Sequence, residues 1–169
     1  MREYIFKEVC RLKSKYKTSD PFSICRELGI DVRERADFKT LKGFYCVMNR
    51  GRFIVINENL NEHDKRIVCA HELGHDRLHR DIAAASVLRD FSLYEMTSKP
   101  EYQANLFAAE MLISDADVMT LAGSGMDYFS MCRTLSYAPD LVAFKLFSMI
   151  QRGHALTLPQ NVNSRFLGK

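Results

Sequence analysis

The sequence has no CxxC pair, no long apolar run and no internal repeat, and each absence excludes a class of protein. Its five cysteines are odd in number and widely spaced, which argues against a disulfide framework or a cysteine zinc site. Reduced thiols in the cytoplasm are the natural expectation. No N-terminal apolar run reaches the about 7–15 residues of a signal peptide, and none approaches the ~20 residues that span a bilayer. We therefore expect a soluble, cytoplasmic protein.

The size and charge of the chain fit one globular domain of 169 residues. The net charge of +3 at pH 7 is too weak to indicate a nucleic-acid partner. The basic residues near the N-terminus are expected to form a solvated helix face rather than a nucleic-acid site; they are Arg2, Lys7, Arg11, Lys13, Lys15 and Lys17.

The first half of the chain predicts helices around a small sheet. Apolar spacing predicts a helix over 3–16, a short helix opened by Asp20-Pro21 and closed by Gly29, and a helix over 62–79. Residues 30–35 alternate as an edge strand would. Residues 43–58 predict a hairpin whose turn, Asn49-Arg50-Gly51, offers glycine for a positive φ.

The second half predicts helices only, over 100–111, 114–121, 127–136 and 139–151. Residues 81–99 are ambiguous, and the tail from 153 to 169 is expected to be loosely held. Together the two halves predict an α+β fold, with a small antiparallel or mixed sheet of about three strands packed against a helical bundle.

An HExxH motif, His71-Glu72-Leu73-Gly74-His75, lies within the predicted helix over 62–79. Residues four apart on a helix are separated by about 40° around its axis, so both imidazoles face the same side and could bind zinc. Glu72 is displaced around the helix, where it could act as the catalytic base on a metal-bound water. The alternative is an amphipathic helix whose histidines bind nothing.

A catalytic zinc needs a third protein ligand, and five residues are candidates: Asp76, His79, Glu95, Glu101 and Glu110. Asp76 lies about 100° around the helix from His75, and His79 lies about 6 Å further along the axis. Glu101 opens the next long helix, with Asn105 one turn later to accept a hydrogen bond from a ligand histidine. Spacing therefore favours Glu101, although an acidic residue in a first helical turn is also stabilised by the helix dipole.

Four segments of the sequence resemble the ImmA/IrrE metallopeptidases. They are AHELGH at 70–75, LH at 78–79, EYQANLFAAEML at 101–112, and the strand IVIN at 54–57. The resemblance covers about residues 40–115 and implies one metallopeptidase domain over 1–169. Within this domain, C-terminal helices over about 114–151 follow the resembling region. It implies a gluzincin-like site with His71, His75 and Glu101 as metal ligands, Glu72 as base, and Asn105 behind a ligand histidine. Ile113-Ser114-Asp115 departs from the family, which often has a proline there.

The resemblance also implies the substrate, a helix-turn-helix repressor of a phage, mobile element or stress regulon that is cut to lift repression. The alternative is a non-catalytic antirepressor that binds the repressor through the same fold. Zinc is the expected metal, and manganese also suits such a site. We expect the hairpin strand before the metal helix to offer an edge to an extended peptide. The oxyanion could be stabilised by one of four tyrosines: Tyr94, Tyr102, Tyr128 or Tyr137.

Overall fold

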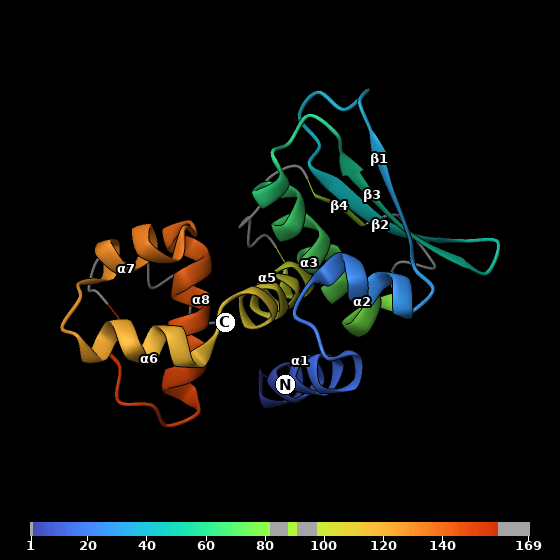
Figure 1. Cartoon of the computed structure of the whole chain (residues 1–169). Coiled ribbons are helices and arrows are strands. Elements are labelled where there is room, and N and C mark those ends of the chain that lie inside the picture. Colours follow the sequence, from blue (N-terminus) through green and yellow to red (C-terminus); the bar gives the residue numbers. More distant parts are fainter. Residues whose placement is uncertain (1, 82–87, 91–97, 159–169) are drawn as a thin grey trace.

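The computed structural model describes residues 2–81, 88–90 and 98–158 (Figure 1). The described elements are, in order, α1 (Arg2–Tyr16), α2 (Pro21–Glu27), β1 (Asp31–Arg35), β2 (Gly43–Met48), β3 (Gly51–Asn57), α3 (Glu62–Leu78), β4 (Leu88–Asp90), α5 (Lys99–Leu112), α6 (Asp115–Gly123), α7 (Tyr128–Leu135) and α8 (Pro139–Gln151). None of the helices in these ranges combines the length and apolarity that crossing a lipid bilayer requires.

The sheet confirms the α+β class and is mixed, with strand order β1-β3-β2-β4. β2 and β3 form the predicted antiparallel hairpin, and β1 runs parallel to β3. A fourth strand, β4, pairs with the first half of β2, so the described sheet has one strand more than the sequence indicated. It comes from the segment that the sequence left ambiguous.

The expectation that the strand before the metal helix offers an edge is wrong. That strand is β3, which has β1 on one side and β2 on the other. The parallel return of β1 after α2 occupies the place that a peptide would need. Among the described strands, the sheet edges are β1 and β4.

The hairpin turn differs from the prediction in where the positive φ angles fall. Met48 pairs with Gly51, so the loop has two residues, Asn49 and Arg50, with φ angles of 50° and 67°. Two-residue hairpin loops favour positive φ at both positions, because this backbone twist matches that of the strands. Gly51 is already the first residue of β3.

Side-chain caps fix where the central helices begin. The Asn61 side chain accepts a hydrogen bond from the Asp64 amide at 2.8 Å and opens α3, while Ser98 caps α5. Ser114 caps α6, so the departure at 113–115 still starts a helix. Such caps satisfy amides that have no partner within the helix.

The core is built in layers around α3 and α5. α3 packs on β2 and β3 with one face and on α5 with another, while α1 and α8 pack on α5. Figure 1 shows α6, α7 and α8 gathered on the side of α5 away from the sheet. The helix α5 is therefore buried along most of its length, which suits its alanine-rich sequence.

The crossing of α3 and α5 is tight at Gly74, within the HExxH motif. A Cβ atom at this position would lie 3.1 Å from the Cα of Ala104, 3.1 Å from the Cβ of Phe107 and 3.3 Å from the Ala104 carbonyl oxygen. Two of these neighbours are backbone atoms, which cannot turn aside as a side chain would. Glycine at 74 thus permits the short distance between the two helices.

We expect Gly74→Ala to lower the free energy of unfolding by about 1–3 kcal/mol through overpacking, against a gain in helix propensity of about 1 kcal/mol. The measurement is urea unfolding of the metal-free protein. Gly123→Ala is the control, because Gly123 is also a helical glycine, at the end of α6, yet nothing lies within 4 Å of its added Cβ. Equal effects of the two substitutions would contradict a tight crossing at Gly74.

Candidate metal centre

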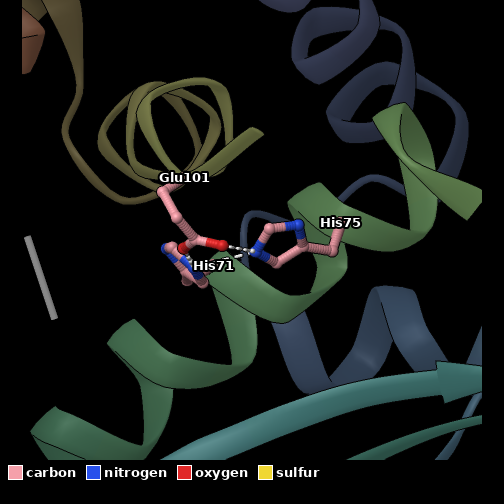
Figure 2. A group of neighbouring side chains, drawn as sticks. All are labelled: His71, His75 and Glu101. Atoms are coloured by element: carbon pink, nitrogen blue, oxygen red, sulfur yellow. Dashed lines mark hydrogen bonds and ion pairs between the residues drawn. The ribbon is translucent and has the colours of Figure 1, made fainter. Parts of the chain in front are cut away.

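Two imidazoles and one carboxylate converge between α3 and α5 (Figure 2). His71 and His75 lie one turn apart on α3, and Glu101 lies in the first turn of α5. The Nε2 atoms of the two histidines are 3.1 Å apart. The Glu101 carboxylate oxygens lie 3.1 Å from Nε2 of His71 and 3.5 Å from Nε2 of His75. The structure therefore brings together the three side chains that the sequence singled out.

The distances and charges of this group fit a metal ion. Ligand atoms at 2.0–2.1 Å from a tetrahedral zinc are roughly 3.3 Å from one another, close to the separations seen here. Burial lowers the pKa of His75 to about 4, so its imidazole is neutral at neutral pH. Burial tends to raise the pKa of Glu101, but the two imidazoles beside it outweigh burial and hold that pKa well below its usual range. Neutral imidazoles and an ionised carboxylate are the forms that bind metal.

Asn105 fixes the orientation of His71, as the sequence led us to expect of its position. The amide oxygen of Asn105 lies 3.0 Å from Nδ1 of His71, and both side chains are buried. A carbonyl oxygen only accepts, so Nδ1 of His71 donates its proton. The lone pair of the neutral ring then lies on Nε2, which faces His75 and Glu101.

Glu72 is fully buried beside His71, on the side of α3 that faces β2. A Cβ at Gly43, the first residue of β2, would lie 3.5 Å from Oε1 of Glu72 and only 2.5 Å from Cγ1 of Val68. The backbone of β2 thus passes directly over this part of α3. Sequence reasoning missed Gly43, because only the folded structure brings the start of the hairpin to Glu72.

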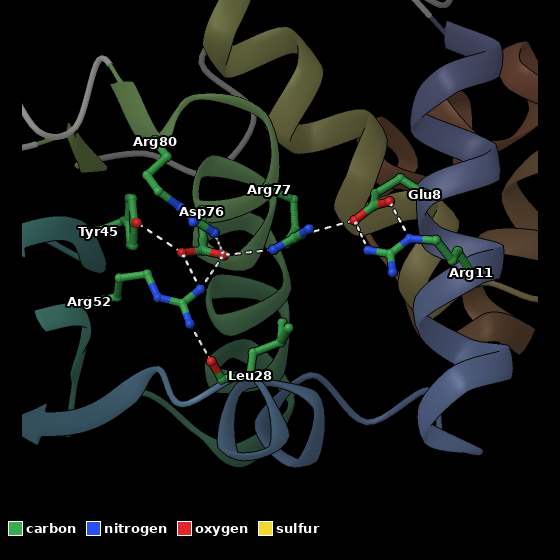
Figure 3. Close-up of polar contacts among 8 residues, drawn as sticks. All are labelled: Glu8, Arg11, Leu28, Tyr45, Arg52, Asp76, Arg77 and Arg80. Atoms are coloured by element: carbon green, nitrogen blue, oxygen red, sulfur yellow. Dashed lines mark hydrogen bonds and ion pairs between the residues drawn. The ribbon is translucent and has the colours of Figure 1, made fainter.

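Asp76 is directed to partners outside the candidate metal centre, as its angle around the helix predicted, and Figure 3 shows it among Tyr45, Arg52, Arg77 and Arg80. Its buried carboxylate accepts a hydrogen bond from the Tyr45 hydroxyl at 2.8 Å and from Nη1 of Arg52 at 3.1 Å. Arg77 and Arg80 lie within 3.5 and 3.3 Å of the same carboxylate. Asp76 therefore belongs to a structural ion network.

The remaining candidates for the third ligand have other places. Glu110 pairs with Lys145 at 2.6 Å in the interior between α5 and α8. His79 lies behind His75, with 3.1 Å between their Nδ1 atoms, and Glu95 lies outside the described residues. Sequence reasoning missed Gln103, whose amide oxygen is 2.8 Å from Nε2 of His79. The sequence could have pointed to Gln103 only through its position between Glu101 and Asn105.

The tyrosines considered for stabilising the oxyanion have different surroundings in the structure. The hydroxyl of Tyr128 donates to the Pro139 carbonyl, and that of Tyr137 lies 3.5 Å from the Leu112 carbonyl. Tyr102 follows Glu101 on α5, and its ring packs on that of Phe144 at 5.4 Å. Tyr94 lies outside the described residues.

Comparison with known proteins agrees with this geometry. The model of the IrrE N-terminal-like domain matches residues 25–130, which include the hairpin, both central helices and the candidate metal centre. The chain belongs to the ImmA/IrrE family of metallopeptidases. The matched region is wider than the segment of 40–115 that the sequence motifs indicated.

Two curated proteins are similar in sequence to this ImmA/IrrE protein. It is 39% identical to uncharacterized immunity region protein 2 of Bacillus phage phi105 over 107 residues, which are 63% of this chain and 66% of the relative. It is 40% identical to the metallopeptidase ImmA of Bacillus subtilis over 62 residues, 37% of this chain and 34% of the relative. The matched segments thus span less than two thirds of the length of either relative.

We expect Asp76→Ala to lower the free energy of unfolding by about 3–5 kcal/mol, because Arg52 and the Tyr45 hydroxyl lose their buried acceptor. Asp31→Ala is the control: it removes the partner of Arg33 in an exposed ion pair, worth about 0–1 kcal/mol. Both are measured by urea unfolding. Zinc content of the folded Asp76→Ala protein should equal that of the wild type, and loss of zinc would contradict the separation of the network from the metal centre.

Proposed function

We propose that the protein is a zinc-dependent endopeptidase in which His71, His75 and Glu101 bind the metal and Glu72 is the catalytic base. The observation that carries the proposal is the convergence of two Nε2 atoms and a carboxylate within 4.8 Å of one another, one residue away from a buried glutamate. Three protein ligands suit a catalytic zinc, which keeps its fourth position for water. A structural zinc would use four.

The reaction divides between the metal and the side chains. Bound zinc supplies a Lewis acid and a water molecule whose pKa falls to about 7. Glu72 takes the proton of the attacking water and passes it to the leaving amine of the cleaved peptide. Asn105 keeps His71 in the tautomer whose Nε2 lone pair would bind the metal. The burial of both histidines excludes competing solvent from the ligand atoms.

The substrate that we propose is a helix-turn-helix repressor, cleaved so that repression is relieved. Support comes from the relatives, because one is named as a phage immunity region protein and the other as a metallopeptidase. We infer that a metallopeptidase related to a phage immunity region protein acts on the repressor that maintains immunity.

The test incubates the purified protein, loaded with zinc or manganese, with the repressor encoded nearest to its gene. We expect intact mass measurement to find one discrete cut with the wild type. Glu72→Gln should reduce the rate by about 10²–10⁴-fold or more, because the base is lost while the ligands remain. The zinc content of Glu72→Gln should be unchanged, whereas His71→Ala should lose the metal.

Cleavage by Glu72→Gln at the wild-type rate would show that Glu72 is not the base, and unchanged zinc in His71→Ala would refute the ligand assignment. If the repressor stays intact but forms a stable complex with both the wild type and Glu72→Gln, the function is that of a non-catalytic antirepressor.

A further inference from the structure

We propose that His79 and Gln103 are positioning residues for the metal centre, holding His75 in the tautomer whose Nε2 lone pair faces the metal. The inference rests on the proposed metal centre. It starts from a chain of three side chains behind His75. Nδ1 of His75 lies 3.1 Å from Nδ1 of His79, and Nε2 of His79 lies 2.8 Å from Oε1 of Gln103.

The end of this chain sets the direction of every hydrogen bond in it. Oε1 of Gln103 is a carbonyl oxygen and only accepts, so Nε2 of His79 carries the proton. A neutral His79 then has a bare Nδ1, which accepts from Nδ1 of His75. His75 in turn has its lone pair on Nε2, the atom 3.1 Å from Nε2 of His71 and 3.5 Å from Glu101.

The reverse orientation would prevent metal binding. If position 103 donated to His79, the proton of His79 would move to Nδ1 and the proton of His75 to Nε2, which could then bind no metal. The acceptor at position 103 therefore determines, through the rings of His79 and His75, whether Nε2 of His75 carries a lone pair for the metal. Burial makes this control effective, because His79 and Gln103 are 6% and 7% exposed and water cannot easily replace their hydrogen bonds.

The same helix supplies the acceptors behind both histidines. Asn105 of α5 accepts from His71 directly, and Gln103 of α5 accepts from His75 through His79. Glu101 of α5 faces both Nε2 atoms. Three residues in alternate positions of α5 thus set the ligand geometry. Asn105 contacts His71 directly, whereas His79 lies between Gln103 and His75.

The experiment measures zinc affinity of the metal-free protein by competition with a chelator, in two matched pairs of variants. His79→Phe keeps a ring of similar size and loses the acceptor, whereas His79→Asn restores an acceptor oxygen. Gln103→Met keeps the shape and loses the carbonyl, whereas Gln103→Glu keeps an oxygen that only accepts.

We expect His79→Phe and Gln103→Met to weaken zinc binding about 10–100-fold, the usual effect of removing a partner of a ligand histidine. His79→Asn and Gln103→Glu should stay close to the wild type or, for the added charge of Gln103→Glu, exceed it. The visible absorption spectrum of the cobalt-loaded protein should change in the first two variants and return to the wild-type form in the second two. A purely structural role would not produce this rescue.

Thermal unfolding of the metal-free variants shows which of them are folded, and if His79→Phe is not folded, Gln103→Met decides. Wild-type affinity and an unaltered cobalt spectrum in folded Gln103→Met would overturn this inference alone, leaving the metal centre in place. Failure of the wild type itself to bind zinc would overturn the proposed function and this inference together.

Discussion

The packing of α3 against α5 places every polar group of the candidate metal centre. His71 and His75 come from α3, while Glu101, Gln103 and Asn105 come from α5. The groups of α3 would not meet those of α5 if another layer of side chains separated the two helices. The approach depends on Gly74 against Ala104, where a single added carbon would lie 3.1 Å from backbone. A packing constraint within the motif thus sets the distance between ligands.

Another side of α3 is held by buried charge. Asp76 is adjacent to His75 in sequence but lies among Tyr45, Arg52 and Arg80, which connects the helix to the hairpin (Figure 3). Arg77 pairs with Glu8 of α1 at 2.9 Å, so the network reaches across the domain. A buried carboxylate without such partners would be strongly unfavourable. The network therefore ties α3 to the hairpin and to α1.

A second buried ion cluster fixes the other end of α5. Lys145 of α8 pairs with Glu110 at 2.6 Å and with Asp115 at 2.5 Å, and Arg152 lies 2.6 Å from Asp115. Burial tends to raise the pKa of Asp115, but Arg152 and Lys145 outweigh burial and hold that pKa well below its usual range. The N-terminal turn of α5 thus faces the candidate metal centre, while its C-terminal turn is tied to α6 and α8. This arrangement leaves α5 little freedom to slide along α3.

The sequence by itself determined the features that arise within one element. The separation of His71 and His75 by one turn follows from helical geometry, and the caps at Asn61, Ser98 and Ser114 follow from local hydrogen bonds. The approximate helix boundaries, the hairpin and the different direction of Asp76 could be predicted for the same reason. Only the tertiary structure decided that β3 is an inner strand, that Gly43 lies over Glu72, and that Gln103 reaches His75 through His79. These contacts join segments far apart in the chain, and their distances depend on how side chains fill the space between elements, which no local periodicity encodes.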